Sequence, residues 1–517
     1  MSFNMNRRSM MKAGAAAGAY AAAGSAALAD DHDPKKGGHF RLGMGGANTS
    51  DSWDGRTHSD SYMINVGHGC VFDCMTEVAA DGSLKGELAE SWEASADAKT
   101  WTFNLRKGVT FHNGKDFSAD DVLETFAIHV EEGSKSPAKP IIGAITEMKK
   151  LDSHQVQFEL AAGNADFPFL LSDYHIVMHP AGMIEESIAK GIGTGGYKVD
   201  SFEPGVRLEA TKYENHYKDD ACFFDSVEAL AITDTNARMS AIATNQVDAI
   251  NKVDFATMQM LTRNPNVNIV EVTGNQHYTF PMHANVAPFD SADIRKAIKY
   301  AFNRQELVDK ILQGHGAIAN DHPIGPANQY FASDLPQTEY DPDKAKFHLK
   351  QAGVDSLAID LSASGAAFNG AVDAALLFQQ SAKAVGIDVN VVREPQDGYW
   401  SNVWQKKPFC ACYWSGRATE DWMFSTAYET GVPWNDNFWE NARFQSLLLE
   451  ARAELDTNKR REMYTEMQML CQTEGAVVVP MYANYVDAAS SKLANSGTIG
   501  NLWMLDGSRI CERWWFA

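Results

Sequence analysis

The sequence predicts an α/β protein that is built on more than one hydrophobic core. The chain has 517 residues, 44% of them hydrophobic and 22% charged, whereas single cores stop growing at about 250–300 residues. Residues 288–326 repeat their apolar side chains every three or four positions, as helices that bury one face do. Residues 84–114 contain an alternating apolar and polar run, which indicates a half-buried strand. Helices and strands are therefore both expected.

Residues 1–29 are expected to be an export signal that is not part of the fold. Asn6–Lys12 contains two consecutive arginines and looks like the twin-arginine export motif, and an Ala- and Gly-rich run follows it to Leu28. Ala27-Leu28-Ala29 fits a cleavage site, and the alternative is a disordered basic tail. No cysteine sits at the cleavage point, so a lipid anchor there is not expected. No later run approaches the ~18 apolar residues of a membrane span. We therefore expect export to the periplasm by the twin-arginine pathway.

The net charge disfavours two classes of partner. The chain carries a formal charge of -22, and removing residues 1–29 takes away three basic residues and no acid. Such an acidic protein is not expected to bind nucleic acid or an anionic membrane surface. The charge says little about a small ligand, because a buried site makes its own local field.

The seven cysteines could be free thiols, disulfides or metal ligands. The spacings Cys70-x3-Cys74 and Cys410-x-Cys412 suggest metal binding, but no second pair with histidines at zinc-finger spacing accompanies either. Disulfides are allowed in an exported protein, although an odd count leaves at least one thiol unpaired. Buried thiols or disulfides are therefore favoured, the pairing stays open, and no metal or cofactor is expected.

Two short patterns organise the first half of the chain. His39–Met44 is expected to be a strand, and the polar loop that follows it, residues 45–55, contains Trp53. Residues 193–198 are rich in glycine, but no GK[ST] follows and the chain continues as a strand, so a phosphate-binding P-loop is not expected.

Residues 84–122 predict a strand, turns and a helix. Trp101, Phe103 and Leu105 alternate with polar residues, as in a half-buried strand. Ser118 is placed to cap a helix whose first turn carries carboxylates. By residue chemistry alone this is a β-hairpin followed by a helix.

Residues 288–326 predict two short consecutive helices. Asp290 or Ser291 can cap the first helix. Asn303 with Glu306 three residues later forms a start like a capping box for the second, and Gly314 suits its end. The apolar faces consist of Ile294, Ala297, Ile298, Ala301 and Phe302, then Leu307, Val308, Ile311 and Leu312.

These stretches resemble the extracytoplasmic solute-binding proteins of family 5, the peptide- and nickel-type receptors of ABC importers. The specific segments are PF-D--IR-A--YA--R-ELV, then Gly and A-----P-GP, in residues 288–326, and LKGELAESWEASADAKTWTFNLRKGVTFHNG in residues 84–114. GTGGYK at 193–198 and YENHYKDD at 213–220 are also similar to the family.

The resemblance implies a type II periplasmic-binding-protein fold of the large peptide-receptor class, with two lobes and an extra small subdomain. Two crossing segments between the lobes favour hinge closure over a ligand. The expected division is lobe I from residues 30–75, 190–273 and 483–517, the extra subdomain from 76–189 packed on lobe I, and lobe II from 274–482, with crossings near 274–284 and 476–482.

The candidate site follows the apolar strand expected at residues 409–413. Open α/β sheets bind ligands just beyond strand ends. In peptide-binding relatives, a Trp in this segment is followed by an Asp that takes the α-ammonium group of the peptide. Here the residue three positions after Trp414 is Arg417, and Glu420 and Asp421 lie further along. We expect Arg417 either to clamp a ligand carboxylate or phosphate or to pair with these two acids.

Aromatic residues from the same region and from the expected crossing complete the candidate site. They could cage a quaternary ammonium or stack on sugars, although most of them should pack the core of lobe II. Trp53 could contact ligand or simply anchor its loop. The candidate ligand contacts are Trp53, His277, Tyr278, Trp400, Trp414, Arg417, Glu420 and Asp421.

The resemblance implies a non-enzymatic, monomeric periplasmic protein that binds a small solute and delivers it to the transmembrane subunits of an ABC permease. A peptide or amino-acid-derived solute is the leading class, and a quaternary amine or an oligosaccharide is the alternative. The competing hypothesis is an exported hydrolase acting on a saccharide or ester. The sequence contains no GxSxG elbow and no HExxH zinc helix, so no catalytic residues are assigned.

Overall fold

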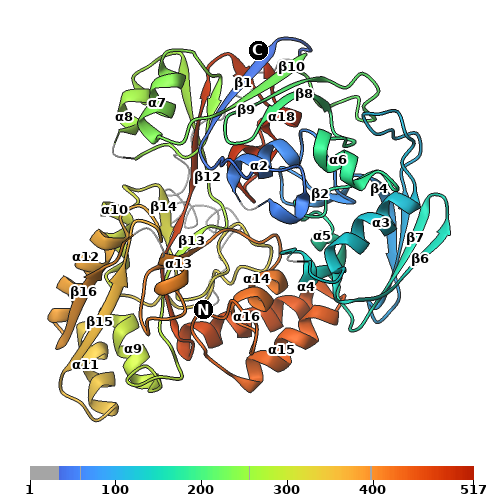
Figure 1. Ribbon diagram of the computed structural model, residues 1–517. Coiled ribbons are helices and arrows are strands. Elements are labelled where there is room, and N and C mark those ends of the chain that lie inside the picture. Colours follow the sequence, from blue (N-terminus) through green and yellow to red (C-terminus); the bar gives the residue numbers. More distant parts are fainter. Residues whose placement is uncertain (1–33, 59, 135, 256, 396–398) are drawn as a thin grey trace, which may run out of the picture.

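The computed structural model describes residues 34–58, 60–134, 136–255, 257–395 and 399–517, so the expected export signal lies outside it. Figure 1 shows a sheet-based lobe at the top, a small subdomain at its side, and a second lobe below with helices on its outer faces. Within the described ranges, no helix combines the length and apolar character needed to cross a membrane.

Lobe I is built on a mixed seven-stranded sheet. The parallel pairs that β1 makes with β10 and β11 lie at its centre, and the other pairs are antiparallel. The predicted strand 39–44 is confirmed as β1. In sheet order the strands are β12 (Val267–Val272), β19 (Tyr485–Ser490), β11 (Ala249–Ile250), β1 (His39–Met44), β10 (Ser226–Ala231), β9 (Arg207–Lys212) and β8 (Tyr197–Glu203). Short elements around it are η1 (Gly55–Thr57), α2 (Ser61–Gly67), α7 (Thr235–Ala243), α8 (Met258–Thr262), β20 (Leu493–Ala494), α17 (Met504–Ser508), α18 (Ile510–Arg513) and β21 (Trp515–Phe516).

The subdomain has its own antiparallel sheet and its own core. Trp101, Phe103 and Leu105 are buried on β5, as their alternation predicted, and Ser118 forms a capping box with Asp121 at the start of α3. The sheet order is β4 (Ala89–Ala94), β5 (Thr100–Leu105), β7 (Gln155–Leu160) and β6 (Ile145–Asp152). The hairpin β2 (Thr76–Val78) and β3 (Leu84–Gly86) and the helices α3 (Ala119–Val130), α4 (Lys139–Ile142), α5 (Phe167–Leu170) and α6 (Ile184–Lys190) complete it.

Lobe II contains a four-stranded antiparallel sheet, a parallel pair of strands, and two groups of helices. The sheet order is β14 (Gly316–Ile318), β18 (Val477–Ala483), β13 (His277–Pro281) and β17 (Cys412–Trp414), and β15 (Leu357–Ala363) pairs with β16 (Ile387–Arg393). The helices are α9 (Ala292–Ala301), α10 (Arg304–Lys310), α11 (Pro342–Gln351), α12 (Ala371–Lys383), α13 (Tyr399–Asn402), α14 (Glu420–Ala427), α15 (Ala442–Ala453) and α16 (Thr457–Thr473).

The two helices predicted in residues 288–326 are confirmed as α9 and α10. Ser291, not Asp290, caps α9 by accepting a hydrogen bond from Ile294 N. Asn303 caps α10 by accepting from Glu306 N. The apolar face of α9 packs into the core of lobe II, where Phe302 stacks on Phe378 with ring centroids 3.8 Å apart. The capping residues and the buried apolar face of this segment thus both match what its sequence predicts.

The chain passes between the sheets of the two lobes at two places. β12 ends at Val272 in the lobe I sheet and β13 begins at His277 in the lobe II sheet, so the first passage is residues 273–276. Residues 476–482, an apolar stretch expected near the second crossing, lie almost wholly in β18, and the chain continues through Asn484 into β19 of the lobe I sheet. Each passage therefore joins a strand of the lobe I sheet directly to a strand of the lobe II sheet.

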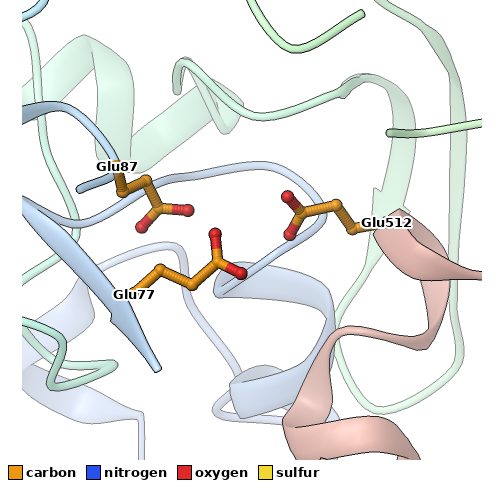
Figure 2. A group of neighbouring side chains, drawn as sticks. All are labelled: Glu77, Glu87 and Glu512. Carbon is orange, nitrogen blue, oxygen red and sulfur yellow. The ribbon is translucent and has the colours of Figure 1, made fainter. Parts of the chain in front are cut away.

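A buried group of ion pairs fastens the C-terminal segment of lobe I to the β2–β3 hairpin of the subdomain. Glu77 lies in β2, Glu87 directly follows β3, and Glu512 lies in α18. Their carboxylate oxygens approach one another within 4.8 Å (Figure 2). Three like charges in a buried site would repel strongly unless cations lay among them.

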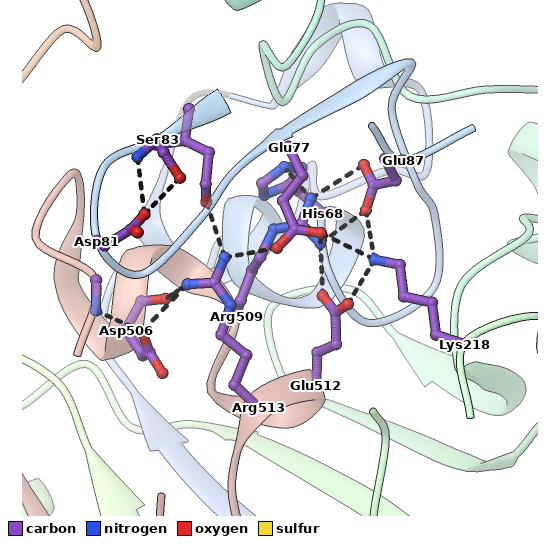
Figure 3. Close-up of polar contacts among 12 residues, drawn as sticks. His68, Glu77, Asp81, Ser83, Glu87, Lys218, Asp506, Arg509, Glu512 and Arg513 are labelled. Carbon is purple, nitrogen blue, oxygen red and sulfur yellow. Dashed lines mark hydrogen bonds and ion pairs between the residues drawn. The ribbon is translucent and has the colours of Figure 1, made fainter. Parts of the chain in front are cut away.

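Those cations are Lys218, Arg509 and Arg513 (Figure 3). The Nζ of Lys218 lies 3.0 Å from Glu77 and 2.9 Å from Glu87. Arg509 is 2.8 Å from Glu87 and Arg513 is 2.8 Å from Glu77. Burial by itself would lower the pKa of Arg509, but the charges of the three carboxylates hold it well above its usual value. The network therefore ties the β2–β3 hairpin, the segment around Lys218, and α18 into one unit.

Replacing Arg509 with methionine tests this unit. Arg509→Met should lower the free energy of unfolding by about 3–5 kcal/mol, because the side chain is 1% exposed and its loss leaves buried carboxylates under-compensated. Urea denaturation and thermal melting measure the effect. The matched control is Arg443→Met, which breaks an exposed pair with Glu466 and should change stability little. Equal melting temperatures for the two variants would contradict the assignment.

Candidate functional site

The turn after β17 lies where the two lobes meet. A Cβ built on Gly416 would lie 2.6 Å from the Cβ of Asn275 and 3.0 Å from the carbonyl oxygen of Leu502, so only glycine fits here without a shift. Asn275 belongs to the first passage between the lobes, and its Nδ2 donates a 3.0 Å hydrogen bond to the carbonyl of Arg417. The turn is thus held against both the hinge and the C-terminal part of lobe I.

Arg417 presents a guanidinium with no carboxylate partner among the described residues. Its Nη1 donates to the carbonyls of Ser415 and Gly416 at 3.3 and 3.2 Å, and the group lies 5.6 Å from the ring centroid of Trp422. The side chain is only half-buried. Backbone carbonyls and an aromatic face orient a guanidinium without neutralising it, so its charge stays available to an anion.

Glu420 and Asp421 do not pair with Arg417, which was the alternative that the sequence left open. Glu420 is 2% exposed and accepts a 2.7 Å hydrogen bond from Tyr330 N. Asp421 is 3% exposed and pairs with Arg452 at 2.9 Å. Because both acids start α14, their side chains turn into the packing between helices of lobe II, and neither lies at the candidate site.

The charge of Arg417 reaches groups on both sides of the boundary between the lobes. Asp173 follows α5 on the subdomain side, and its pKa lies below its usual value: burial raises it, but His175, hydrogen bonds and the Arg417 charge lower it. Tyr413 lies on β17 of lobe II, where burial raises its pKa and Arg417 opposes that shift. The charge of Arg417 therefore acts on ionisable groups of both parts of the protein.

Three of the predicted contacts lie on the lobe II sheet beside Arg417. His277 and Trp414 are directly opposite each other on β13 and β17, and both are buried. Tyr278 is half-buried and stacks on Phe368 with ring centroids 4.1 Å apart. Burial lowers the pKa of His277 to about 4, with a smaller contribution from Arg417, so this imidazole is neutral at neutral pH.

Trp400 belongs to an exposed aromatic cluster next to the site. It is 41% exposed and lies 5.6 Å from Tyr413, which is 37% exposed. Trp404 connects Trp400 to the buried Trp414 with centroid distances of 5.9 and 6.3 Å. Fewer aromatic residues of the region are buried than the sequence predicted. The buried ones are Tyr399, Trp414 and Trp439, whereas Trp400, Tyr413, Trp434 and Phe438 are exposed to solvent.

Trp53 lies in the core of lobe I and not at the site. It is 2% exposed and packs against Phe72 and Phe202, with ring centroids 6.1 and 4.6 Å away. The indole is therefore an anchor for the loop that follows β1, which was the alternative that the sequence allowed.

The sequence predictions missed four residues around Arg417. Asn275 lies only two positions before the predicted His277, and Asp173 and Tyr174 occur in a polar run after the apolar α5 segment. Tyr174 packs edge-on against Trp503 with ring centroids 5.2 Å apart, and Trp503 follows Leu502 at the site. The polar and aromatic run after a buried segment could have indicated that Tyr174 is a site residue. The sequence around Trp503 contains no comparable pattern.

Two other features of the molecule resemble binding sites. The carboxylates in Figure 2 would suit a metal ion, but Lys218, Arg509 and Arg513 already neutralise them, so we assign the group a structural role. A cavity of about 790 Å³ is lined by residues of lobe II alone, among them Phe438 and Glu474, and it does not include Arg417. The seven cysteines are buried free thiols in this structure.

Comparison with known proteins gives one matching family over most of the chain. The family model described as bacterial extracellular solute-binding proteins, family 5 Middle, matches residues 83–436. The dipeptide-binding protein of Escherichia coli is 26% identical over 436 residues, which are 76% of this chain and 79% of that protein. The di/tripeptide-binding protein 1 of Pseudomonas aeruginosa is 27% identical over 441 residues, or 78% and 82% of the two chains.

Solved structures share the fold. The periplasmic binding protein DppA of Helicobacter pylori, in complex with the peptide STSA, has a TM-score of 0.78 and 21% identity, with 93% of this chain and 98% of that chain covered. NikZ of Campylobacter jejuni, in complex with Ni(L-His), has a TM-score of 0.78 and 20% identity, with coverages of 92% and 99%. The predicted two-lobed fold with a subdomain is confirmed by these matches.

Proposed function

Because the chain belongs to family 5 of the bacterial extracellular solute-binding proteins, we propose that it binds a small solute between its two lobes and delivers it to the permease of an ABC importer. The proposed location is the periplasm and the proposed export route is the twin-arginine pathway, since residues 1–29 carry the arginine pair and a small-residue stretch that fits a cleavage site. We propose that the protein acts as a monomer.

The solute is proposed to be a peptide or amino-acid-derived molecule with a carboxylate. The single observation that carries this proposal is the guanidinium of Arg417, which lies at the meeting of the lobes with no carboxylate partner among the described residues. Arginine binds carboxylates through two parallel hydrogen bonds, which gives both energy and geometric specificity. The names of the relatives, which include dipeptide- and di/tripeptide-binding proteins, agree with this class.

Contacts far from the hinge support a closing motion around the solute. The loop after β7 reaches lobe II, where Asp166 pairs with Arg460 at 2.7 Å and Ala165 N donates to the carbonyl of Arg452 at 2.7 Å. Both side chains of the ion pair are less than a tenth exposed. Such a pair can form only when the lobes are together, so it favours the arrangement that encloses the solute.

The competing hypothesis is an exported hydrolase. A receptor binds one solute per chain at saturation and returns it unchanged, whereas a hydrolase releases product. A thermal-shift screen of peptides, amino acids, betaines and oligosaccharides identifies candidates, because a solute that binds only the folded state raises its apparent stability. Chromatography of each recovered solute then distinguishes the two classes.

Replacing Arg417 tests the anchor. Arg417→Ala should weaken solute binding by about 2–5 kcal/mol, the effect of losing one partner of a desolvated charge pair, with little change in melting temperature. Arg417→Lys should recover only part of the affinity, because the two-pronged geometry is gone. Isothermal titration calorimetry with the solutes from the screen measures both. Arg443→Ala, which removes an exposed arginine of lobe II, is the control. Unchanged affinity with a lowered melting temperature would contradict the anchor.

Replacing Asp166 tests closure. Asp166→Asn should weaken the binding of every solute by a similar factor, roughly 1–2 kcal/mol, because it removes a contact of the closed arrangement and none of the solute. Calorimetry gives the affinities, and small-angle scattering with and without solute gives the change in shape. Glu454→Gln, which breaks an exposed pair with Lys459 inside lobe II, should leave affinity unchanged. A change in the order of preference among solutes would contradict this role.

A further inference from the structure

Three buried cysteines of lobe I lie around one tyrosine. Cys70, Cys222 and Cys511 are 0%, 1% and 2% exposed and belong to the same apolar core. The backbone N–H of Tyr197 donates to the carbonyl of Cys70 at 3.0 Å, and its hydroxyl donates to the carbonyl of Cys511 at 3.1 Å. The N–H of Cys222 donates at 2.8 Å to the carbonyl of Glu512, the residue after Cys511. Hydrogen bonds therefore join distant chain segments around these thiols.

Two of these thiols are in contact. A hydrogen bond with the side chain of Cys511 is the main reason that the pKa of Cys70 lies well above its usual value, and burial adds to it. Cys222 acts on Cys70 through its charge alone. Its Sγ packs against Gly196, where an added Cβ would lie 2.0 Å from that sulfur. Cys74, the other thiol of this core, donates to a backbone carbonyl at 3.4 Å. Cys511 is therefore the cysteine that contacts the thiol of Cys70, and such contact is the first requirement for a disulfide.

Cys511 belongs to the segment that the buried ion pairs hold in place. It lies in α18 between Arg509 and Glu512, which Figure 3 shows within the ion-pair network. Cys70 follows α2, about 440 residues earlier in the sequence. The C-terminal segment also brings the carbonyl of Leu502 against the turn of the candidate site. A covalent bond between the two cysteines would tie this segment to the core of lobe I.

We propose that Cys70 and Cys511 form a disulfide in the oxidising compartment and that this bond locks the C-terminal segment onto lobe I. The structure holds the reduced form of the pair. Disulfides form and persist in exported proteins because their surroundings are oxidising. This inference goes beyond solute binding and rests on the proposed periplasmic location.

The bond forms by thiol–disulfide exchange with glutathione disulfide or with the disulfide of a thiol oxidase. One cysteine, as its thiolate, attacks a sulfur of the oxidant and releases one reduced thiol. The other cysteine then attacks the mixed disulfide and releases the second reduced thiol. One S–S bond forms in the protein and one breaks in the oxidant, which takes up two electrons and the two protons.

Burial makes this oxidation slow while the fold is closed. The thiolate is the reactive form, and the raised pKa of Cys70 keeps its thiol protonated. An oxidant cannot reach a side chain that is 0% exposed. The reaction therefore requires local opening of α18, which the ion pairs of Arg509 oppose. The rate of disulfide formation thus measures how firmly the C-terminal segment is held.

The test counts thiols in the purified, reduced, full mature chain after incubation with glutathione disulfide. The protein is quenched with acid, unfolded in urea, labelled with N-ethylmaleimide and mapped by mass spectrometry without reduction. Two of the seven thiols should escape labelling, and the peptides that contain Cys70 and Cys511 should be linked. The oxidised chain should melt at a higher temperature than the reduced chain, because the bond constrains the unfolded state. Dithiothreitol should remove that difference.

Variants test both the pair and its protection. Arg509→Met should speed disulfide formation at least about tenfold because it loosens α18, whereas Arg443→Met should leave the rate unchanged. Cys511→Ala should leave every remaining thiol open to labelling. The matched control is Cys471→Ala, which removes a buried thiol of lobe II and should still give the linked peptides.

Two results would overturn the pair. They are complete labelling of all seven thiols in both wild-type protein and Arg509→Met, and linkage of Cys70 to Cys222 in place of Cys511. If Cys511→Ala does not fold, the peptide map of wild-type protein still decides.

Protein taken from the periplasm and quenched in acid should carry the same bond, and its absence there overturns the lock. If the chain is found reduced in the cytoplasm while the purified protein forms the pair, the proposed location fails and the pair stands. None of these measurements uses a solute, so their failure leaves the proposed solute binding intact.

Discussion

The two lobes are joined by a pair of antiparallel chain segments, and the position of the candidate site depends on that connection. β12 and β19 pair in lobe I up to Val272 and Tyr485, and β13 and β18 pair in lobe II from His277 and Tyr482. Only a few residues separate the two ladders on each segment, so the passages lie side by side. These two short passages, here called the hinge, fix which residues of each lobe come to face one another.

The hinge also explains why the candidate site is where it is. The strand that leaves the hinge, β13, pairs with β17, so the turn after β17 is brought against Asn275 and the C-terminal part of lobe I. Arg417 is thereby placed by backbone pairing and by a glycine that allows close approach, not by an ion pair of its own. Its charge is left for a partner that the protein does not supply among the described residues.

Elsewhere in the molecule, buried charged groups are paired with opposite charges that the protein itself supplies. Glu77, Glu87 and Glu512 are surrounded by lysine and arginine at ion-pair distance, and Asp421 has Arg452. Removing charges from water is costly, and these groups offset the cost with internal partners. The contrast between such paired groups and the guanidinium of Arg417, which has no carboxylate partner among the described residues, is the physical basis on which binding is assigned to one place and structure to the others.

The sequence by itself determined the helices, strands and caps, because these depend on residues a few positions apart. Ser291 and Asn303 cap their helices and Trp101, Phe103 and Leu105 face a core through local spacing alone. It also determined the family, since the matching motifs span most of the chain. Only the tertiary structure decided which polar residues meet: local pattern cannot show that Asp421 finds Arg452, that Trp53 packs in lobe I, or that Trp503 reaches Tyr174 from more than three hundred residues away. Side-chain partners are chosen by the packing of distant elements, and that packing is a property of the whole fold.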